Sequence, residues 1–172
     1  MQNIDEFERA VNKHADLGHC LLKGNLDGSL FNESRAGHTN SDEPTQYAVL
    51  DIDGVSITPD ELMRALGFEN KDYFYQYSSS SGIIRQADQG KIIPPLDRYH
   101  IFTLLESLVT PKQLKTQLKH WNLNIPQLRN RVKLTKTNLA LSYPLDISVC
   151  QNDKLIYITR PICREGVIDT LA

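Results

Sequence analysis

The chain has 172 residues and contains no apolar run close to the roughly 18 residues that a membrane-spanning helix needs. It also lacks the composition of a disordered chain, a collagen or a disulfide-rich miniprotein. Its formal net charge of −2 is too small for the total charge to indicate a nucleic-acid-binding protein. What is left is one compact domain, or one domain with an appendage, that buries a hydrophobic core.

Cysteine is scarce, with only Cys20, Cys150 and Cys163 and no pair in C-x-x-C spacing. Such an odd and scattered set is typical of reduced thiols in a cytosolic protein. The N-terminal segment has neither the basic nor the apolar region of a signal peptide, so we expect a cytoplasmic protein without membrane partners. A zinc site from His14, His19 and Cys20 stays open, although their spacing suits no common zinc motif.

Acidic residues are absent between Glu106 and Asp146, a stretch of 39 residues that carries seven lysines and arginines. These cations are Lys112, Lys115, Lys119, Arg129, Arg131, Lys133 and Lys136, and His120 lies among them. Cations without counter-charges make a positive local surface, which favours contact with a nucleic-acid backbone. The alternative is a solvated helix face, because the first three lysines share one side of a helix opposite leucines.

Capping signals and apolar periodicity divide the chain into helices and strands. Asn3 and Thr58 each precede a glutamate by three residues, as in a capping box, and Thr110-Pro111 is a further helix start. We expect helices over residues 3–15, 58–67 and from 110 onward, and strands over residues 19–23, 46–53, 72–77, 98–106, 144–149 and 154–159. Residues 24–45 form a loop that is long for a compact domain. The alternation implies an α/β or α+β fold.

The clearest strand ends in Asp51-Ile52-Asp53. Residues i and i+2 of a strand point to the same face, so two carboxylates are held side by side. Their mutual repulsion would protonate one of them unless a cation lies between them. Mg²⁺ or Mn²⁺ is the natural cation, because hard ions bind carboxylate and phosphate oxygens. The alternative is a pair of solvated acids at the turn before Gly54.

Two later strands also carry charged residues. Arg98 and His100 share a strand face by the same rule, and a guanidinium beside an imidazole suits a triphosphate, the alternative being a satisfied core or rim histidine. Asp146 is a lone acid within an apolar strand, where an unpaired carboxylate is costly. A third ligand for a metal pair would explain it, and a salt bridge or an outward-facing residue is the alternative.

A polar turn, Ser78 to Gly82, follows the strand at 72–77. The hydroxyls and free backbone N–H groups of Ser79, Ser80 and Ser81 can form a cradle for an anion. A flexible loop is the alternative interpretation of the same residues.

Taken in order, these motifs resemble the archaeo-eukaryotic primase superfamily, in the primase-polymerase branch carried by plasmids, phages and other mobile elements. That family has a strand ending in D-x-D, which would be Asp51 and Asp53 here. Its second motif is a strand with a histidine two residues after a small or basic residue, here Arg98-x-His100. Its third is an apolar strand with one acid, here Asp146. The resemblance covers roughly residues 17–163.

The resemblance implies a single catalytic domain over residues 1–172, with an N-terminal α/β unit over about 1–45 and a catalytic core over about 46–163. The core would be an RRM-like antiparallel sheet backed by helices, of the α+β class. The implied activity is DNA-directed nucleotidyl transfer, which makes or extends primers on single-stranded DNA for the replication of a mobile element.

The resemblance also implies roles for the residues above. Asp51, Asp53 and Asp146 would be catalytic and would bind two Mg²⁺ or Mn²⁺ ions. His100, Arg98 and the serine turn would bind the nucleoside triphosphate, with Arg35 as a further phosphate contact. The basic segment would bind the single-stranded template. A replicative helicase or an initiator protein would be a further partner.

Two other hypotheses stay open. The run from Asp51 to Val55 matches the first motif of HAD-type phosphatases, with Asp51 as the nucleophile and Asp53 as the acid/base. A non-catalytic module that binds single-stranded nucleic acid would need only the basic segment. The position of Asp146 separates the enzymes, because a primase would use this residue in the same site and a phosphatase would not.

Overall fold

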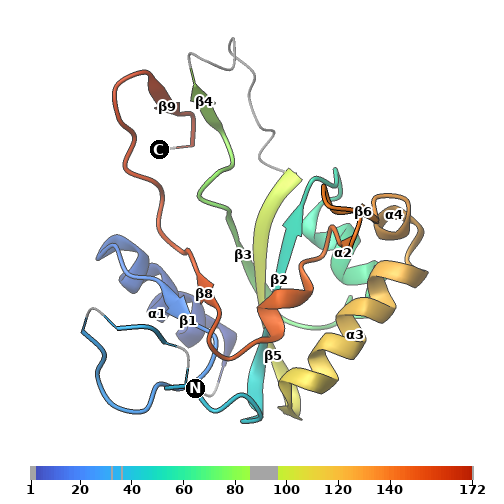
Figure 1. The fold of residues 1–172 in the computed structure, drawn as a ribbon, viewed down its shortest axis with the longest axis horizontal. Helices are drawn as coiled ribbons and strands as arrows, with labels where there is room; N and C mark the ends of the chain where they lie inside the picture. Colours follow the sequence, from blue (N-terminus) through green and yellow to red (C-terminus); the bar gives the residue numbers. More distant parts are fainter. Residues whose placement is uncertain (1–2, 32, 36, 86–96, 172) are drawn as a thin grey trace.

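The computed structural model describes residues 3–31, 33–35, 37–85 and 97–171, which form both helices and antiparallel sheets (Figure 1). The helices are α1 (Ile4–Asp16), α2 (Pro59–Ala65), α3 (Pro111–Asn124), α4 (Pro126–Arg129) and the 3₁₀ helix η3 (Ile147–Cys150). The strands are β1 (Leu21–Leu22), β2 (Thr45–Asp53), β3 (Tyr73–Tyr77), β4 (Ile83–Arg85), β5 (Arg98–Val109), β6 (Lys133–Leu134), β7 (Leu141–Ser142), β8 (Leu155–Ile156) and β9 (Val167–Asp169). The expected α+β class is confirmed at this level.

The main sheet has the strand order β2-β5-β3, and both neighbouring pairs are antiparallel. β2 and β5 pair over nearly their whole lengths, from Thr45 opposite Val109 to Asp53 opposite Arg98. Outside the main sheet, the described strands form the short pairs β1–β8, β4–β9 and β6–β7. Because side chains alternate along a strand, the long pairing fixes which residues of β2 and β5 share each face of the sheet.

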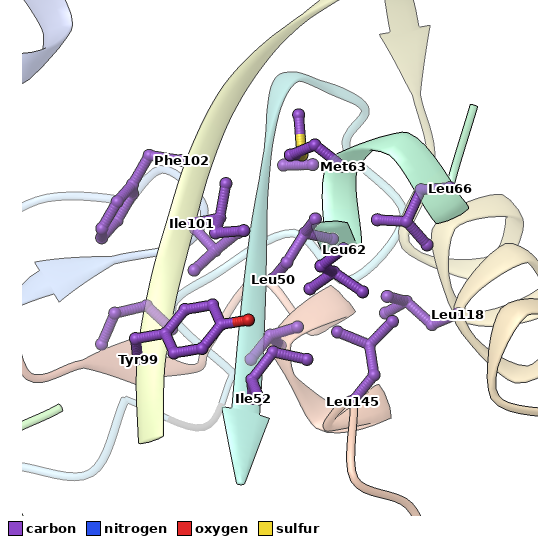
Figure 2. Close-up of a cluster of buried hydrophobic side chains, with 14 of the residues drawn as sticks. Leu50, Ile52, Leu62, Met63, Leu66, Tyr99, Ile101, Phe102, Leu118 and Leu145 are labelled. Atoms are coloured by element: carbon purple, nitrogen blue, oxygen red, sulfur yellow. The ribbon is translucent and has the colours of Figure 1, made fainter. Parts of the chain in front are cut away.

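One face of the sheet carries most of the hydrophobic core. Leu50 and Ile52 of β2 are fully buried, and Figure 2 shows them facing Leu62 of α2, Leu118 of α3 and Leu145. Burial of each such side chain contributes about 1.5–3 kcal/mol. The helices α2 and α3 therefore cover this face, and their apolar stripes hold β2 against them.

The other face of the same sheet is apolar at one end only. Phe7 of α1 makes edge-to-face contacts with Tyr47, Phe74 and Phe102, and the rings of Phe74 and Phe102 are stacked at 4.8 Å. Figure 1 places α1 on the side of the sheet away from α2 and α3. This covered end stops before the last residues of β2 and the first of β5, where Asp51, Asp53 and Arg98 stay partly exposed.

The predicted helix starts are confirmed in detail. The Asn3 side chain accepts a hydrogen bond from the Glu6 amide, and Thr58 with Glu61 forms a complete capping box. Thr110 does the same with Gln113 at the start of α3. Each cap satisfies amide donors that the first turn of a helix leaves unpaired, so these starts were readable from local sequence alone.

The strand predicted over residues 144–149 is wrong. Only Leu145 forms an isolated antiparallel bridge, to Ile52, and residues 147–150 wind into η3. The reason is local, because the Asp146 carboxylate accepts from the Ser148 amide at 2.8 Å and so starts a helical turn. The strands expected over 19–23 and 154–159 are shorter than predicted, since β1 and β8 pair over two residues each.

The long loop over residues 24–45 is tied to the C-terminal part of the chain. The Asn152 side chain donates to the carbonyls of Asn40 and Glu43, at 2.7 and 2.8 Å. Gly24 lies so close that a Cβ atom there would come within 2.5 Å of the Asn152 Cβ, which explains the glycine. In the part of the chain described here, no helix is both long and apolar enough to cross a membrane.

Candidate active site

The register between β2 and β5 places the first two predicted motifs opposite each other. Asp51 is opposite His100, and the His100 Nε2 lies 3.3 Å from Asp51 Oδ1. Asp53 is opposite Arg98, whose Nε lies 2.7 Å from Asp53 Oδ1. The four side chains therefore share one face of the sheet, where β2 ends and β5 begins.

Asp146 joins them through the segment that follows β7. The Asp146 amide donates to the Asp51 carbonyl at 2.8 Å, and the Asp53 amide donates to the Pro144 carbonyl at 2.9 Å. Ile52 and Leu145, which pair between these two bonds, are both fully buried in the core. Asp51, Asp53 and Asp146 consequently lie on the opposite, open face, so the structure brings together carboxylates from two distant stretches of the chain.

These carboxylates line a cleft of about 360 Å³. Its walls also include Ser78, Ser80 and Arg98 on one side and residues at and after the β6–β7 hairpin on the other, namely Thr135, Leu141, Ser142 and Tyr143. The volume is in the range of small-ligand sites, which is about 300–1,000 Å³. The hairpin residues were not predicted, because their position depends on the turn between β6 and β7.

The serine turn contributes to the cleft through part of its length. Arg98 Nη1 donates to Ser80 Oγ at 3.2 Å, so the guanidinium bridges Ser80 and Asp53. Ser81 is fully buried and its hydroxyl donates to the Arg98 carbonyl. Ser79 is not among the lining residues. Of the three serines predicted to hold an anion, Ser80 alone lines the cleft, and Ser78, which was not among them, does so as well.

His100 lies behind Asp51 and is not among the residues that line the cleft. It is 6% exposed, its ring packs edge-on near Phe102, and Nε2 faces the Asp51 carboxylate. Its Nδ1 is buried and has no hydrogen-bond partner among the described residues. The histidine is thus placed to orient Asp51, and a bound ligand would reach Asp51 first.

The Asp146 carboxylate is held by a small polar network. It accepts from the Ser148 hydroxyl at 2.6 Å and from the Ser148 amide, and Lys154 Nζ lies 3.3 Å away. Burial on its own would raise the pKa of Asp146, but the bonds from Ser148 and the charge of Lys154 outweigh it and lower the pKa. Asp146 is therefore kept ionised, and Lys154 is a site residue that the sequence reasoning missed.

Two sets of hydrogen bonds, one part-buried and one buried, fix the walls of the cleft. Arg160 pairs with Asp169 through two nitrogens and also donates to the carbonyls of Ser78 and Ser81, which ties the serine turn to β9. Asn122 of α3 is fully buried, donates to the Leu145 carbonyl at 2.8 Å and accepts from the Leu145 amide at 3.1 Å. It thereby pairs with Leu145 as a neighbouring strand would.

The predicted nucleic-acid-binding residues lie outside the cleft. All seven cations between residues 112 and 136 are exposed, and α3 turns Leu114 and Leu118 toward the core. The ion pairs found among the described residues do not include any of the seven. Arg35, the further predicted phosphate contact, does not line the cleft either. It donates a hydrogen bond to the Asp153 carbonyl.

The three carboxylates suit a hard divalent cation by their chemistry, because carboxylate oxygens are the preferred ligands of Mg²⁺ and Mn²⁺. Each of them is, however, engaged by its own partner: His100, Arg98, or Ser148 with Lys154. Over the described residues, no three side chains of His, Cys, Asp or Glu gather closely enough to hold a metal ion. His14, His19 and Cys20 are therefore not such a group, although the Nδ1 atoms of the two histidines are 2.9 Å apart.

No family model, curated protein or solved structure that was compared with the chain matches it. The interpretation of the cleft therefore depends on its own geometry. That geometry comprises three carboxylates, one guanidinium and three serines around one cleft.

Proposed function

We propose that the protein is a DNA primase/polymerase-type nucleotidyltransferase that makes or extends primers on single-stranded DNA. The observation that supports this most strongly is the register in which Asp146 pairs beside Asp51, on the face that also carries Asp53. Carboxylates from separate segments that line one cleft are the donor set that a two-metal site requires.

In this proposal Asp51, Asp53 and Asp146 would hold two Mg²⁺ or Mn²⁺ ions. When bound, these ions would activate the attacking 3′-oxygen and stabilise the leaving pyrophosphate. Arg98 and Ser80 would bind the phosphates of the nucleotide, since the guanidinium donates in a fixed planar fork. His100 would keep Asp51 oriented from behind, and Lys154 would do the same for Asp146.

The exposed cations between residues 112 and 136, Arg131 included, would bind the template backbone. Backbone contact of this kind is independent of sequence and weakens as salt is added. A mobile element as the replicon served, and a helicase or initiator as partner, follow from the resemblance alone and form part of the same proposal.

The test is primer synthesis and extension on single-stranded DNA, with Mg²⁺ or Mn²⁺ supplied, in the wild type and in Asp53→Ala. Asp53→Ala is expected to lose incorporation by roughly 100-fold or more, as when a major electrostatic contact of a transition state is removed. His100→Ala is expected to lose less, because His100 acts through Asp51. A matched control is Glu106→Ala, an exposed carboxylate on β5 outside the cleft.

The same samples test the phosphatase alternative. Template-independent release of phosphate from a small phosphoester, lost in Asp51→Asn and retained in Asp146→Asn, would contradict the proposal. Binding of single-stranded DNA without any incorporation in Mg²⁺ or Mn²⁺ would favour the non-catalytic module instead.

A further inference from the structure

The β6–β7 hairpin is an ordered projection beside the cleft. Its turn is closed by hydrogen bonds from the Thr135 amide to the Ala140 carbonyl, at 2.8 Å, and from the Asn138 amide to the Thr135 carbonyl, at 2.9 Å. Asn138 has a φ of 58°, the one non-glycine residue with positive φ in the described chain. Left-handed backbone is unfavourable for most residues and is tolerated best by asparagine, so this tight turn is specified by the sequence.

This ordered turn exposes leucines to solvent. Leu139 is 88% exposed at the tip, and Leu134 and Leu141 on the two strands are 57% and 46% exposed. Single exposed apolar residues are common on protein surfaces, but three leucines on one short hairpin form a patch of the kind that marks a contact surface. The hairpin holds this patch outward instead of folding it onto the core.

The charges around the patch indicate the partner. Lys133 and Lys136 belong to the hairpin, Arg131 precedes it, and all three are exposed without an ion pair among the described residues. The nearest acids along the chain are Glu106 and Asp146, on either side of the basic stretch. The charged side chains of the hairpin and of the residue pair before it are therefore all cations, and the carboxylates of the cleft lie only at the Leu141 end. Apolar residues beside exposed cations complement a chain that has apolar faces and a negative backbone, as unpaired nucleic acid does.

The hairpin is also part of the cleft wall. Thr135 and Leu141 line the same cavity as Asp51 and Asp53, and Figure 1 places β6 near α4 on the side of the sheet away from α1. A strand lying on the hairpin would therefore end next to the carboxylates.

We infer that the β6–β7 hairpin is the surface that holds single-stranded nucleic acid at the mouth of the cleft. Leu139 contacts the unstacked bases, and Lys133 and Lys136 contact the phosphates on either side. This inference deepens the proposed function, because it identifies the strand that enters the site, but the binding it describes does not require catalysis.

The experiment measures the binding of fluorescein-labelled oligothymidylate by anisotropy over a series of salt concentrations. A second oligonucleotide of the same length carries abasic sites and so keeps the phosphates without the bases. Leu139→Ser is expected to weaken oligothymidylate binding by about five-fold, the loss of a modest base contact, and to leave abasic binding and the salt dependence unchanged.

The double variant Lys133→Ala/Lys136→Ala is expected to weaken both oligonucleotides. Its salt slope should fall by about 1.4, since each phosphate contact on a single strand contributes about 0.7. Leu17→Ser and Lys13→Ala are the matched controls, because both residues are exposed, lie in or directly after α1, and do not line the cleft. Neither control should change either affinity.

The outcomes are distinct. Equal affinities of Leu139→Ser and wild type for oligothymidylate, or absence of binding by the wild type, would overturn the inference and favour a protein partner for the leucines. If the wild type shows the expected binding of both oligonucleotides but no primer extension, the proposed function is overturned and the inference about the hairpin stands. Leu139 is so exposed that its replacement is not expected to affect folding, which a thermal melt checks.

Discussion

The two ends of one sheet face differ in how their side chains are satisfied. At the end covered by α1, Tyr47, Phe74 and Phe102 pack around Phe7 and exclude water. At the open end, Asp51 and Asp53 each lie opposite a basic residue of β5. The same pair of strands therefore builds a core at one end and a row of charges at the other. Stability should depend mainly on the first end, and the proposed activity on the second.

The largest effect on stability is expected at the covered end. Phe102→Ala removes a fully buried ring that packs against the rings of Phe7 and Phe74, so it should lower the free energy of unfolding by about 3–5 kcal/mol. Urea denaturation measures this. The matched variant Asp53→Ala removes a half-exposed ion pair and should cost less than about 1 kcal/mol. Equal losses in both variants would show that the two ends are not separate.

Lys23 is the exception at the covered end, because it is a buried cation that makes no ion pair with a carboxylate of the described residues. It lies over the Tyr47 ring and donates to Thr45, and burial lowers its pKa to about 8, from 10.5. The folded state then binds this proton less tightly than the unfolded state does. Stability should rise by about 1–2 kcal/mol between pH 8 and 9.5 through this group.

Lys23→Met should flatten that rise, because it removes the titrating group while keeping most of the volume. Unfolding by urea at several pH values measures the slope. Lys13→Met, at an exposed lysine of α1, is the control and should leave the pH dependence as it is in the wild type. A parallel rise in wild type and Lys23→Met would show that Lys23 is solvated.

A smaller effect is expected for the network around Asp146. Ser148→Ala removes one hydrogen bond to the carboxylate and one from Lys154, and should cost about 1 kcal/mol at pH 7. Because the folded pKa of Asp146 is lowered, its stabilising contribution is present above about pH 4 and is lost as the pH falls through the folded value. The difference between variant and wild type should therefore shrink in acid. A difference that stays constant to pH 2 would contradict this account.

Much of the fold follows from local signals in the sequence. The caps at Asn3, Thr58 and Thr110 mark real helix starts, and the apolar run before Asp51 is a real strand. The neighbourhood of Asp146 was harder to predict, since a short-range bond from Ser148 to its side chain overrides the apolar pattern. Local periodicity cannot show such a competition between a side chain and the ladder.

The sequence predicted most of the charged residues of the candidate site, but it predicted less well how they are arranged in space. The i, i+2 rule correctly places Asp51 beside Asp53 and Arg98 beside His100. It cannot show that His100 is buried behind Asp51, because that depends on the pairing between two strands far apart in the chain. Lys154 and Arg160 were missed for the same reason, as their partners lie on other segments.

The pairing of Asn122 with both backbone groups of Leu145 has a mechanical consequence. Asn122 belongs to α3, the helix whose outer side carries three lysines, and Leu145 immediately precedes Asp146. In the proposed function, a nucleic acid bound along α3 and the Asp146 carboxylate would therefore be held by two segments that are hydrogen-bonded to each other. The distance between the bound strand and Asp146 would then be fixed by the folded structure, and α3 would not have to move for the strand to reach the carboxylate.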